Sequence, residues 1–297
     1  MYEKILVPLD GSELAEVALP YAEELAGRLG SQISLLYVSE SPEDHYQRMH
    51  QFYIEKTAET TKEGAGRYIE KPEGKAIKVE SRILVGNAAE EIVEYASKED
   101  ICLIVMATHG RSGISRWALG SVADKVVRST ERPVGLIRAK GARPDVREKG
   151  ILNKVLVPLD GSKEGEAVMP YIEELSSRFK AEIVLLQVLS TSYQAIASEG
   201  YGYVTYTDKQ IESDKAFARG YLEKAGARLK QKGVTVKYEV RLGIAAEEII
   251  KLADEMYADV VAMSTHGRSG IGRWAFGSVA DRVLHEGNTP LLLVRPH

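Results

Sequence analysis

The chain has 297 residues, which is enough for two domains of ordinary size. Its composition, with 44% hydrophobic and 28% charged residues, is that of a folded globular protein. A net charge of −4 argues against the basic surface that nucleic-acid-binding proteins use. Apolar runs such as residues 101–107 are far shorter than the roughly 20 residues that span a bilayer. The single cysteine, Cys102, cannot form an internal disulfide. We therefore expect a cytoplasmic protein that binds neither nucleic acid nor a membrane.

Strand and helix patterns alternate along the first half of the chain. It opens with a short apolar run at residues 5–7, which Pro8 and Gly11 close, as expected for a buried parallel strand. Apolar residues at helical spacing follow, with Pro20 inside the pattern, so we expect this helix to kink or restart there. The later elements are expected, in order, as a strand at 33–38, a helix that ends near residue 69, a strand at 76–84, a helix at 88–97, a strand at 101–107, a helix at 121–129 and a strand at 134–137. This alternation predicts a parallel, doubly wound α/β sheet of five strands with helices on both faces.

The second half of the chain repeats the first. The segment KILVPLDGS at 4–12 returns as KVLVPLDGS at 154–162, identical at eight of nine positions and displaced by 150 residues. The 19 residues from Thr108 return from Thr265 with 16 identities, now displaced by 157 residues. We place the seven extra residues in the stretch 190–210, which is rich in Gly, Ser, Thr and Tyr. The sequence therefore predicts a first copy at 1–140, a linker at 141–150 and a second copy at 151–297.

Two loops at predicted strand ends carry the residues of chemical interest. One follows the first strand and contains Asp10, and the other is a glycine-rich loop after the fourth strand that runs on to Gly120 and Ser121 at a helix start. In an open α/β sheet, ligands bind at the carboxyl ends of the strands, where the strand order reverses. A helix start with free N–H groups and a serine hydroxyl favours an anion, so the loops together predict a phosphate site. Neither a Walker A loop nor a G-x-G-x-x-G motif is present in the sequence.

These loops resemble those of universal stress proteins. Gly110, nine residues and then Gly120-Ser121 match the family's G-2x-G-9x-G-(S/T) motif, and Gly267 with Gly277-Ser278 repeats it. The resemblance covers nearly the whole chain and is closest to the nucleotide-binding branch of the family. It implies two tandem five-stranded sheets of the Rossmann-like, adenine nucleotide alpha hydrolase-like type. The first glycine of the motif is replaced by Ala107 in the first copy and by Ser264 in the second. Both residues carry a Cβ atom, so the backbone can approach a ligand less closely at these positions than at a glycine.

The resemblance also implies ATP, or ADP or AMP, in each copy, with or without Mg²⁺ on the phosphates. The contacts that it implies in the first copy are Pro8, Leu9, Asp10, Val38, Met106, Ala107, Thr108, His109, Gly110, Arg111, Ser112, Gly113, Gly120, Ser121, Val122 and Ala123. Those in the second copy are Pro158, Leu159, Asp160, Val188, Met263, Ser264, Thr265, His266, Gly267, Arg268, Ser269, Gly270, Gly277, Ser278, Val279 and Ala280. The sequence offers no protein cage for a metal ion, and Mg²⁺ commonly relies on waters and substrate oxygens instead.

Some of these residues also have a purely structural interpretation. Asp10 and Ser12 could cap the following helix, and the glycines could serve only as turn residues. The loop arginines could pair with phosphates or remain solvated, and the two tryptophans are better explained as apolar anchors than as adenine stackers. These residues are Arg111, Arg116, Arg268, Arg273, Trp117 and Trp274. The sequence also leaves open whether Tyr193, Tyr201, Tyr203 and Tyr206 form a lid over the second site or a partner surface.

Three functions remain in view. The first is a nucleotide-binding regulatory module, whose role in the stress response rests entirely on the resemblance. The second is a slow ATPase or phosphotransferase at the same sites, for which His109 and His266 are the only candidate bases. The third is a scaffold without nucleotide binding, although both copies keep the glycines that such family members lack. We expect the first, and therefore a protein that is not an enzyme.

The last strands predict how the copies associate. Val134–Ile137 and Leu291–Val294 are apolar, and left unpaired at a sheet edge they would invite aggregation. Single-domain members of the family resemble two-fold dimers joined along these strands. We therefore expect the copies to form an internal pseudo-dimer with their last strands antiparallel, and we leave a homodimer of the whole chain open.

Overall fold

The computed structural model describes residues 2–41, 46–69, 77–110, 119–138, 150–190, 208–267 and 276–296. The elements of the first copy are β1 (Lys4–Leu9), α1 (Glu13–Glu16), α2 (Leu19–Leu29), β2 (Gln32–Ser39), α3 (Gln47–Gly66), β3 (Val79–Val85), α4 (Ala88–Lys98), β4 (Leu103–Ala107), α5 (Ser121–Ser129) and β5 (Val134–Ile137). Those of the second copy are β6 (Lys154–Pro158), η1 (Gly165–Val168), α7 (Met169–Phe179), β7 (Glu182–Leu189), α8 (Asp208–Ala225), α9 (Ala227–Gln231), β8 (Val236–Leu242), α10 (Ala245–Glu255), β9 (Val260–Ser264), α11 (Ser278–Glu286) and β10 (Leu291–Val294).

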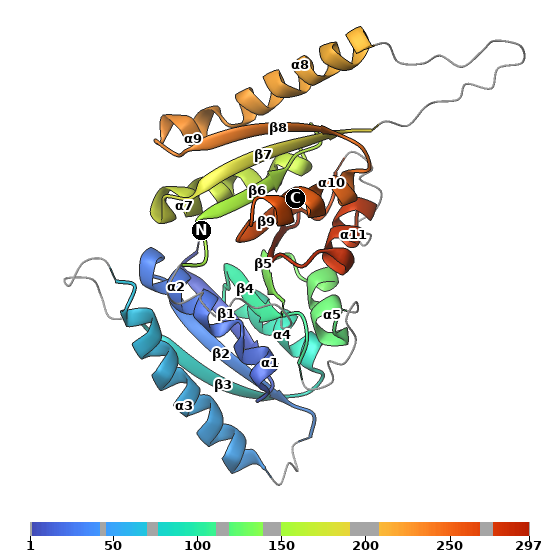
Figure 1. Cartoon of the computed structure of the whole chain (residues 1–297). Helices are drawn as coiled ribbons and strands as arrows, with labels where there is room; N and C mark the ends of the chain where they lie inside the picture. Colours follow the sequence, from blue (N-terminus) through green and yellow to red (C-terminus); the bar gives the residue numbers. More distant parts are fainter. Residues whose placement is uncertain are drawn as a thin grey trace, which may run out of the picture.

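All ten strands belong to one continuous sheet, in the order β3-β2-β1-β4-β5-β10-β9-β6-β7-β8. Neighbouring strands run parallel except at the centre, where β5 and β10 are antiparallel and Leu136 lies opposite Leu291. Figure 1 shows the two copies on either side of this central pair. We call the β5–β10 contact the seam. The expected antiparallel pairing of the last strands is confirmed, and it merges the two expected sheets into one.

Two arginines reinforce the seam reciprocally. Arg138 follows β5 and donates to the carbonyl oxygens of Val283 and Leu284 in α11 of the other copy. Arg295 follows β10 and donates to the carbonyl oxygens of Arg128 and Thr130 at the end of α5, at 3.4 and 3.3 Å. The last carbonyl groups of a helix lack intrahelical partners, so each copy caps a helix of the other. Burial lowers the pKa of Arg138 to about 10, so this side chain remains charged at neutral pH.

The buried side chains form two clusters that follow the faces of the sheet rather than the copies. Ile5 and Val7 belong to one cluster and Leu6 to the other, so β1 is buried on both faces, which explains its unbroken apolar sequence. The first cluster takes side chains from α2, α3, α7, α8 and α9, and the second from α4, α5, α10 and α11. Each cluster contains residues of both copies, so the buried core is continuous across the seam.

The expected restart of the first helix is confirmed in both copies. Helix α1 ends at Glu16, and Pro20 lies in the first turn of α2, where its missing N–H costs no hydrogen bond. Pro170 occupies the same place in α7, behind the 3₁₀ turn η1. Asp10 and Asp160 come before these elements, just after the ends of β1 and β6, so their loops lie at the carboxyl ends of the strands.

The helices that cross from the second to the third strand correct one expectation. Tyr53 of α3 donates to Glu16, and Tyr221 of α8 donates to Glu166, each at 2.8 Å. Glu16 and Glu166 match at a displacement of 150 residues, but the two tyrosines are 168 apart. Between Glu166 and Tyr221 the second copy therefore carries 18 residues more than the first copy has between Glu16 and Tyr53. Between Tyr221 and Thr265 it has 11 residues fewer than the first copy has between Tyr53 and Thr108. The seven residues assigned to 190–210 are only the net difference.

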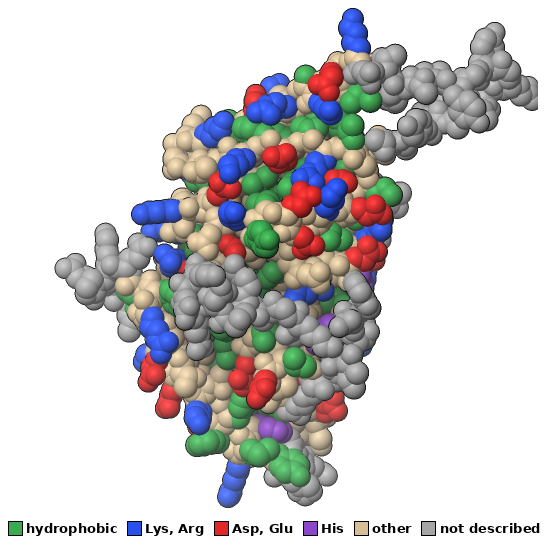
Figure 2. All heavy atoms as spheres, viewed as in Figure 1, with side chains coloured by type: hydrophobic (Ala, Val, Ile, Leu, Met, Phe, Trp, Pro, Cys, Tyr) green, Lys and Arg blue, Asp and Glu red, His purple; other side chains and the backbone are tan. Residues whose placement is uncertain are grey.

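The surface is mixed in charge. Figure 2 shows Lys and Arg side chains interspersed with Asp and Glu over the face in view. Among the described residues, no helix is both long and apolar enough to cross a membrane.

Candidate functional site

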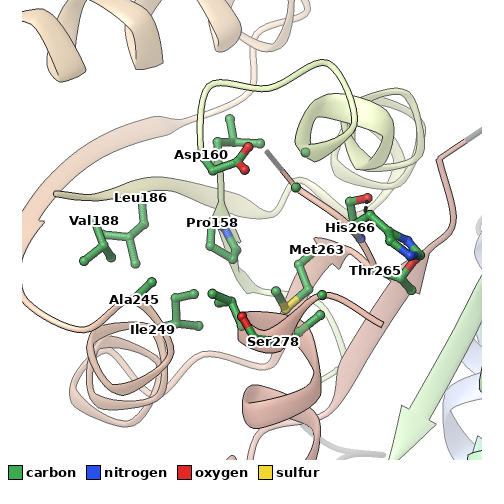
Figure 3. Close-up of a pocket in the computed structure, with 17 residues that line it drawn as sticks. Pro158, Asp160, Leu186, Val188, Ala245, Ile249, Met263, Thr265, His266 and Ser278 are labelled. Carbon is green, nitrogen blue, oxygen red and sulfur yellow. Dashed lines mark hydrogen bonds between the residues drawn. The ribbon is translucent and has the colours of Figure 1, made fainter. Parts of the chain in front are cut away.

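A cavity of about 260 Å³ opens at the carboxyl ends of β6 and β9 (Figure 3). These strands are neighbours, and the strand order reverses between them, as it does between β1 and β4 in the first copy. This is the place where open α/β sheets bind ligands. The loop after β6, the loop after β9 and the start of α11 all contribute to its wall.

One end of the cavity is apolar. Leu186 and Val188 lie along β7, Ala245 and Ile249 lie on α10, and Figure 3 shows these four side chains together. Pro158 and Met263 line the cavity between this group and its polar end. An apolar wall of this kind suits the flat face of an aromatic ring.

The polar end contains Asp160, which organises the loop after β6. Its Oδ1 atom accepts hydrogen bonds from the backbone N–H and the hydroxyl of Ser162, at 3.0 and 2.6 Å. The Ser162 hydroxyl in turn accepts the N–H of Gly165 at 2.9 Å, at the start of η1. Asp10 and Ser12 repeat the arrangement in the first copy, where Ser12 is the N-cap of α1. The capping interpretation therefore holds for the serine, and the aspartate orients that serine.

Gly110 and Gly267 lie against the carboxylates of these aspartates. A Cβ atom at Gly267 would overlap Oδ2 of Asp160, and one at Gly110 would overlap Oδ2 of Asp10. Real Cβ atoms do not approach an oxygen this closely, so the second loop packs directly on the carboxylate of the first. The glycine thus joins the two loops of the site.

Helix α11 presents its N-terminus to the cavity. Its N-cap is Gly277, which makes no side-chain cap, and its N–H donates to the carbonyl oxygen of Thr265 at 2.9 Å. The first N–H groups of a helix lack intrahelical partners and carry partial positive charge. Ser278, Val279 and Ala280 supply these groups at the cavity wall. We call residues 277–280, and the equivalent residues 120–123 of α5, the helix starts.

The two histidines of the glycine-rich loops are partly buried. Nδ1 of His266 lies 2.9 Å from the hydroxyl of the buried Thr265, and His109 and Thr108 repeat this contact at 3.1 Å. Nε2 of each ring is shielded from solvent and has no hydrogen-bond partner in the described part of the chain. A general base must reach the proton that it removes, and this Nε2 is not presented to solvent.

The structure brings together all of the site residues predicted in the second copy that it describes. Those that line the cavity are Pro158, Leu159, Asp160, Val188, Met263, Ser264, Thr265, His266, Gly267, Gly277, Ser278, Val279 and Ala280. Their contact with a nucleotide stays a prediction. The predictions for Arg111, Ser112, Gly113, Arg268, Ser269 and Gly270 lie outside the described residues, as do those for Arg116, Arg273, Trp117, Trp274, Tyr193, Tyr201, Tyr203 and Tyr206.

Four further residues line the cavity that sequence reasoning missed. They are Gly165, Leu186, Ala245 and Ile249. Leu186 is two positions before Val188, and side chains at that spacing share one face of a strand. Ala245 and Ile249 are four apart on α10 and share one face of that helix. The two periodicities could have identified three of the four.

Comparison with known proteins gives the site its context. The sequence model described as the Universal stress protein family matches residues 1–138 and again residues 152–295. The chain belongs to the universal stress protein family. A universal stress protein of Methanocaldococcus jannaschii is 31% identical over 145 residues, which cover 46% of this chain and 83% of that protein. One from Synechocystis is 24% identical over 317 residues, covering 99% of this chain and 100% of the relative. The crystal structure of a universal stress protein from Archaeoglobus fulgidus has the same fold, with a TM-score of 0.64, 20% identity and 99% of both chains covered.

This tandem universal stress protein carries nearly the same residues at both sites. Of the 17 residues that line the cavity of the second copy, only two differ in the first, where Ala15 replaces Gly165 and Ala107 replaces Ser264. The hydroxyl of Ser264 accepts the N–H of His266 at 3.4 Å, a contact that Ala107 cannot make. The differences therefore lie in the first helical turn after the aspartate loop and at the last residue of β4 and β9, and they leave the apolar wall and the helix start unchanged.

Proposed function

We propose that this universal stress protein binds one adenine nucleotide in each copy and acts as a regulatory module. The observation that carries the proposal is the combination within one cavity of an apolar wall, a loop aspartate and the N-terminus of α11. A nucleotide needs these three features in this order, for its base, its ribose and its phosphates. The phosphates would fit the helix start because it offers exposed N–H groups and the hydroxyl of Ser278.

The adenine would lie against Val188, Ile249 and Met263, with Asp160 near the ribose hydroxyls. The phosphates would accept hydrogen bonds from the N–H groups and hydroxyl at residues 277–280. Among the described residues, no cluster of three or more His, Cys, Asp or Glu side chains could hold a metal ion. A Mg²⁺ ion bound here would therefore take its ligands mainly from phosphates and water.

We propose further that the sites hold the nucleotide rather than hydrolyse it, and that the protein works in the cytoplasm as part of the stress response. The burial of His266 Nε2 supports a binding role, because this ring nitrogen is not exposed to act as a general base. Steady-state phosphate release tests this point. A rate above that of the Gly120→Val/Gly277→Val variant, in which a Cβ would crowd Thr108 and Thr265, would favour an enzyme instead.

The decisive experiment is to purify the protein without added nucleotide, denature it and identify the released compound by chromatography and mass spectrometry. We expect an adenine nucleotide, at up to two per chain. Calorimetry with ATP should then give binding to the emptied protein. Absence of both a released nucleotide and ATP binding would refute the proposal.

A further inference from the structure

Arg128 lies between the helix starts of the two copies. It is in the last turn of α5, and its Nη2 donates to Oδ1 of Asp281 at 2.8 Å, across the seam. Its Nε donates to Oδ1 of Asp124 on its own helix, also at 2.8 Å. Figure 1 shows α5 and α11 beside each other on the same flank of the seam. One guanidinium group therefore bridges carboxylates of both copies.

Each carboxylate directly follows a helix start. Asp124 is in the first turn of α5 and its N–H donates to Gly120, while Asp281 is in the first turn of α11 and its N–H donates to Gly277. A carboxylate in the first turn interacts favourably with the helix dipole, but it repels a second anion at the same N-terminus. Arg128 pairs with both, and so offsets the negative charge at each proposed phosphate site.

The second copy receives one more contact from Arg128. The guanidinium carbon lies 5.2 Å from the centre of the Phe276 ring, which suits a cation–π interaction. Phe276 precedes Gly277, and Asp281 follows Ser278 in the same turn, so Arg128 contacts the chain on both sides of this helix start. The residue thus fixes a helix start in one copy from a helix in the other.

The mirror position carries no such residue. The repeat places His285 where Arg128 would be and Leu119 where Phe276 would be. Nδ1 of His285 lies 2.7 Å from the carbonyl oxygen of Asp281 on its own helix and 3.7 Å from Oδ2 of the same residue. In the part of the chain that the structure describes, the ion pair of Asp124 is with Arg128 of its own helix. Among the described residues, Arg128 alone therefore pairs with both carboxylates.

We propose that Arg128 is a positioning residue for phosphate binding at both sites. It acts through Asp124 and Asp281, whose charges it pairs, and holds the second helix start through Phe276. This inference rests on the proposed function. It adds that the two sites share one cation, located at the seam.

The test is calorimetry on the full chain with ATP and, separately, adenosine. Arg128→Met should weaken ATP binding about 3- to 10-fold and leave adenosine unchanged, because adenosine has no phosphate for the carboxylates to repel. Arg128→Lys should recover part of the loss, since lysine keeps the charge but not the planar fork that reaches two carboxylates. Arg219→Met, which removes an arginine that pairs with Glu223 on α8 instead, should leave both ligands unchanged.

A second background separates electrostatics from folding. In an Asp124→Asn/Asp281→Asn chain the repelling charges are gone, so adding Arg128→Met should cost no further ATP affinity. An equal loss for ATP and adenosine, an unchanged ATP affinity in Arg128→Met, or a loss that persists in the Asn background would overturn the inference. If the unaltered chain binds ATP and Arg128→Met is silent, only this inference fails. If the unaltered chain binds no ATP, the proposed function fails as well.

Discussion

At the scale of single residues, the contact between Asp160 and Gly267 holds the two loops of the second site together, and we call this contact the joint. The aspartate holds Ser162 and through it the start of η1, while its other oxygen packs on the glycine. Sequence reasoning selected both residues for the site, and both line the cavity. It assigned the glycine to the approach of a ligand, because a one-dimensional motif does not show that the first loop reaches the second.

Gly267→Ala tests this joint. The new methyl group would displace the Asp160 carboxylate, so we expect a loss of about 1–3 kcal/mol in the free energy of unfolding and weaker ATP binding. Gly220→Ala is the matched control, because nothing lies within 4 Å of its added Cβ in the interior of α8. That control should keep or slightly raise the stability. Thermal unfolding followed by circular dichroism measures both, and equal melting temperatures for the two variants would contradict the joint.

Substitution of the serines at the helix starts tests whether the phosphates of the ligand bind there. Ser121→Ala/Ser278→Ala should weaken ATP about 10- to 100-fold, because each lost hydrogen bond to a phosphate is worth roughly 1.5–3 kcal/mol. Adenosine should bind nearly as before, since it places no phosphate at α5 or α11. Equal losses for the two ligands in calorimetry would show that these serines do not contact phosphate.

At the scale of elements, the crossover helices α3 and α8 are tied to the loops of the sites. Tyr53 and Tyr221 donate to Glu16 and Glu166, in the elements that directly follow the aspartate loops. Burial, followed by the hydrogen bond to the carboxylate, raises the pKa of both phenols well above the usual value. Each phenol therefore stays protonated in the folded chain at a pH where it ionises in the unfolded chain.

The sign of the pH effect follows from this difference. As the pH rises above about 10, the unfolded chain loses phenolic protons that the folded chain keeps, so the free energy of unfolding falls. Tyr53→Phe/Tyr221→Phe should cost about 1 kcal/mol per hydrogen bond at neutral pH and make the decline with pH shallower. Tyr257→Phe is the control, because Tyr257 is 83% exposed. The measurement is urea unfolding across this pH range. If the free energy of unfolding fell with pH at the same slope in the unaltered chain, the double variant and the control, the raised pKa of the two phenols would be contradicted.

The elements themselves were largely predictable, and the reason is local. Helices α4 and α5 and strand β5 begin where the sequence indicates, because apolar periodicity and helix-capping residues act over one or two turns. The register of α8 was not predictable in the same way. Its sequence does not match that of α3, and its place is set by packing of Leu222 in α8 and of Leu229 in α9, which lie where Ile54 and Thr61 lie in the first copy.

At the scale of the whole molecule, the seam makes the two copies one cooperative unit. Both buried clusters cross it, β5 and β10 share backbone hydrogen bonds, and Arg138 and Arg295 cap helices of the opposite copy. The pairing of the last strands was predictable from the resemblance to two-fold dimers of the family, and its physical reason is that an unpaired apolar edge is unfavourable in water. The shared cores and the reciprocal arginines were not, since they depend on the angle at which the copies meet.

We therefore expect a single calorimetric unfolding transition for the full chain. One copy cannot unfold without exposing apolar surface of the other, which couples their free energies of unfolding. Arg138→Met, which removes one reciprocal cap, should lower the melting temperature while the transition stays single. Two well-separated transitions in the unaltered protein would show instead that each copy is stable by itself.

The covalent link between the copies has a consequence for how the protein can change. In a dimer of identical chains, any substitution at a two-fold contact occurs twice and must be compatible with its own image. Here Arg128 faces Asp281 and Phe276, while the mirror contact carries His285 and Leu119. The presence of both copies in one chain thus removes the demand for self-complementarity, and each side of the contact can mutate independently of the other.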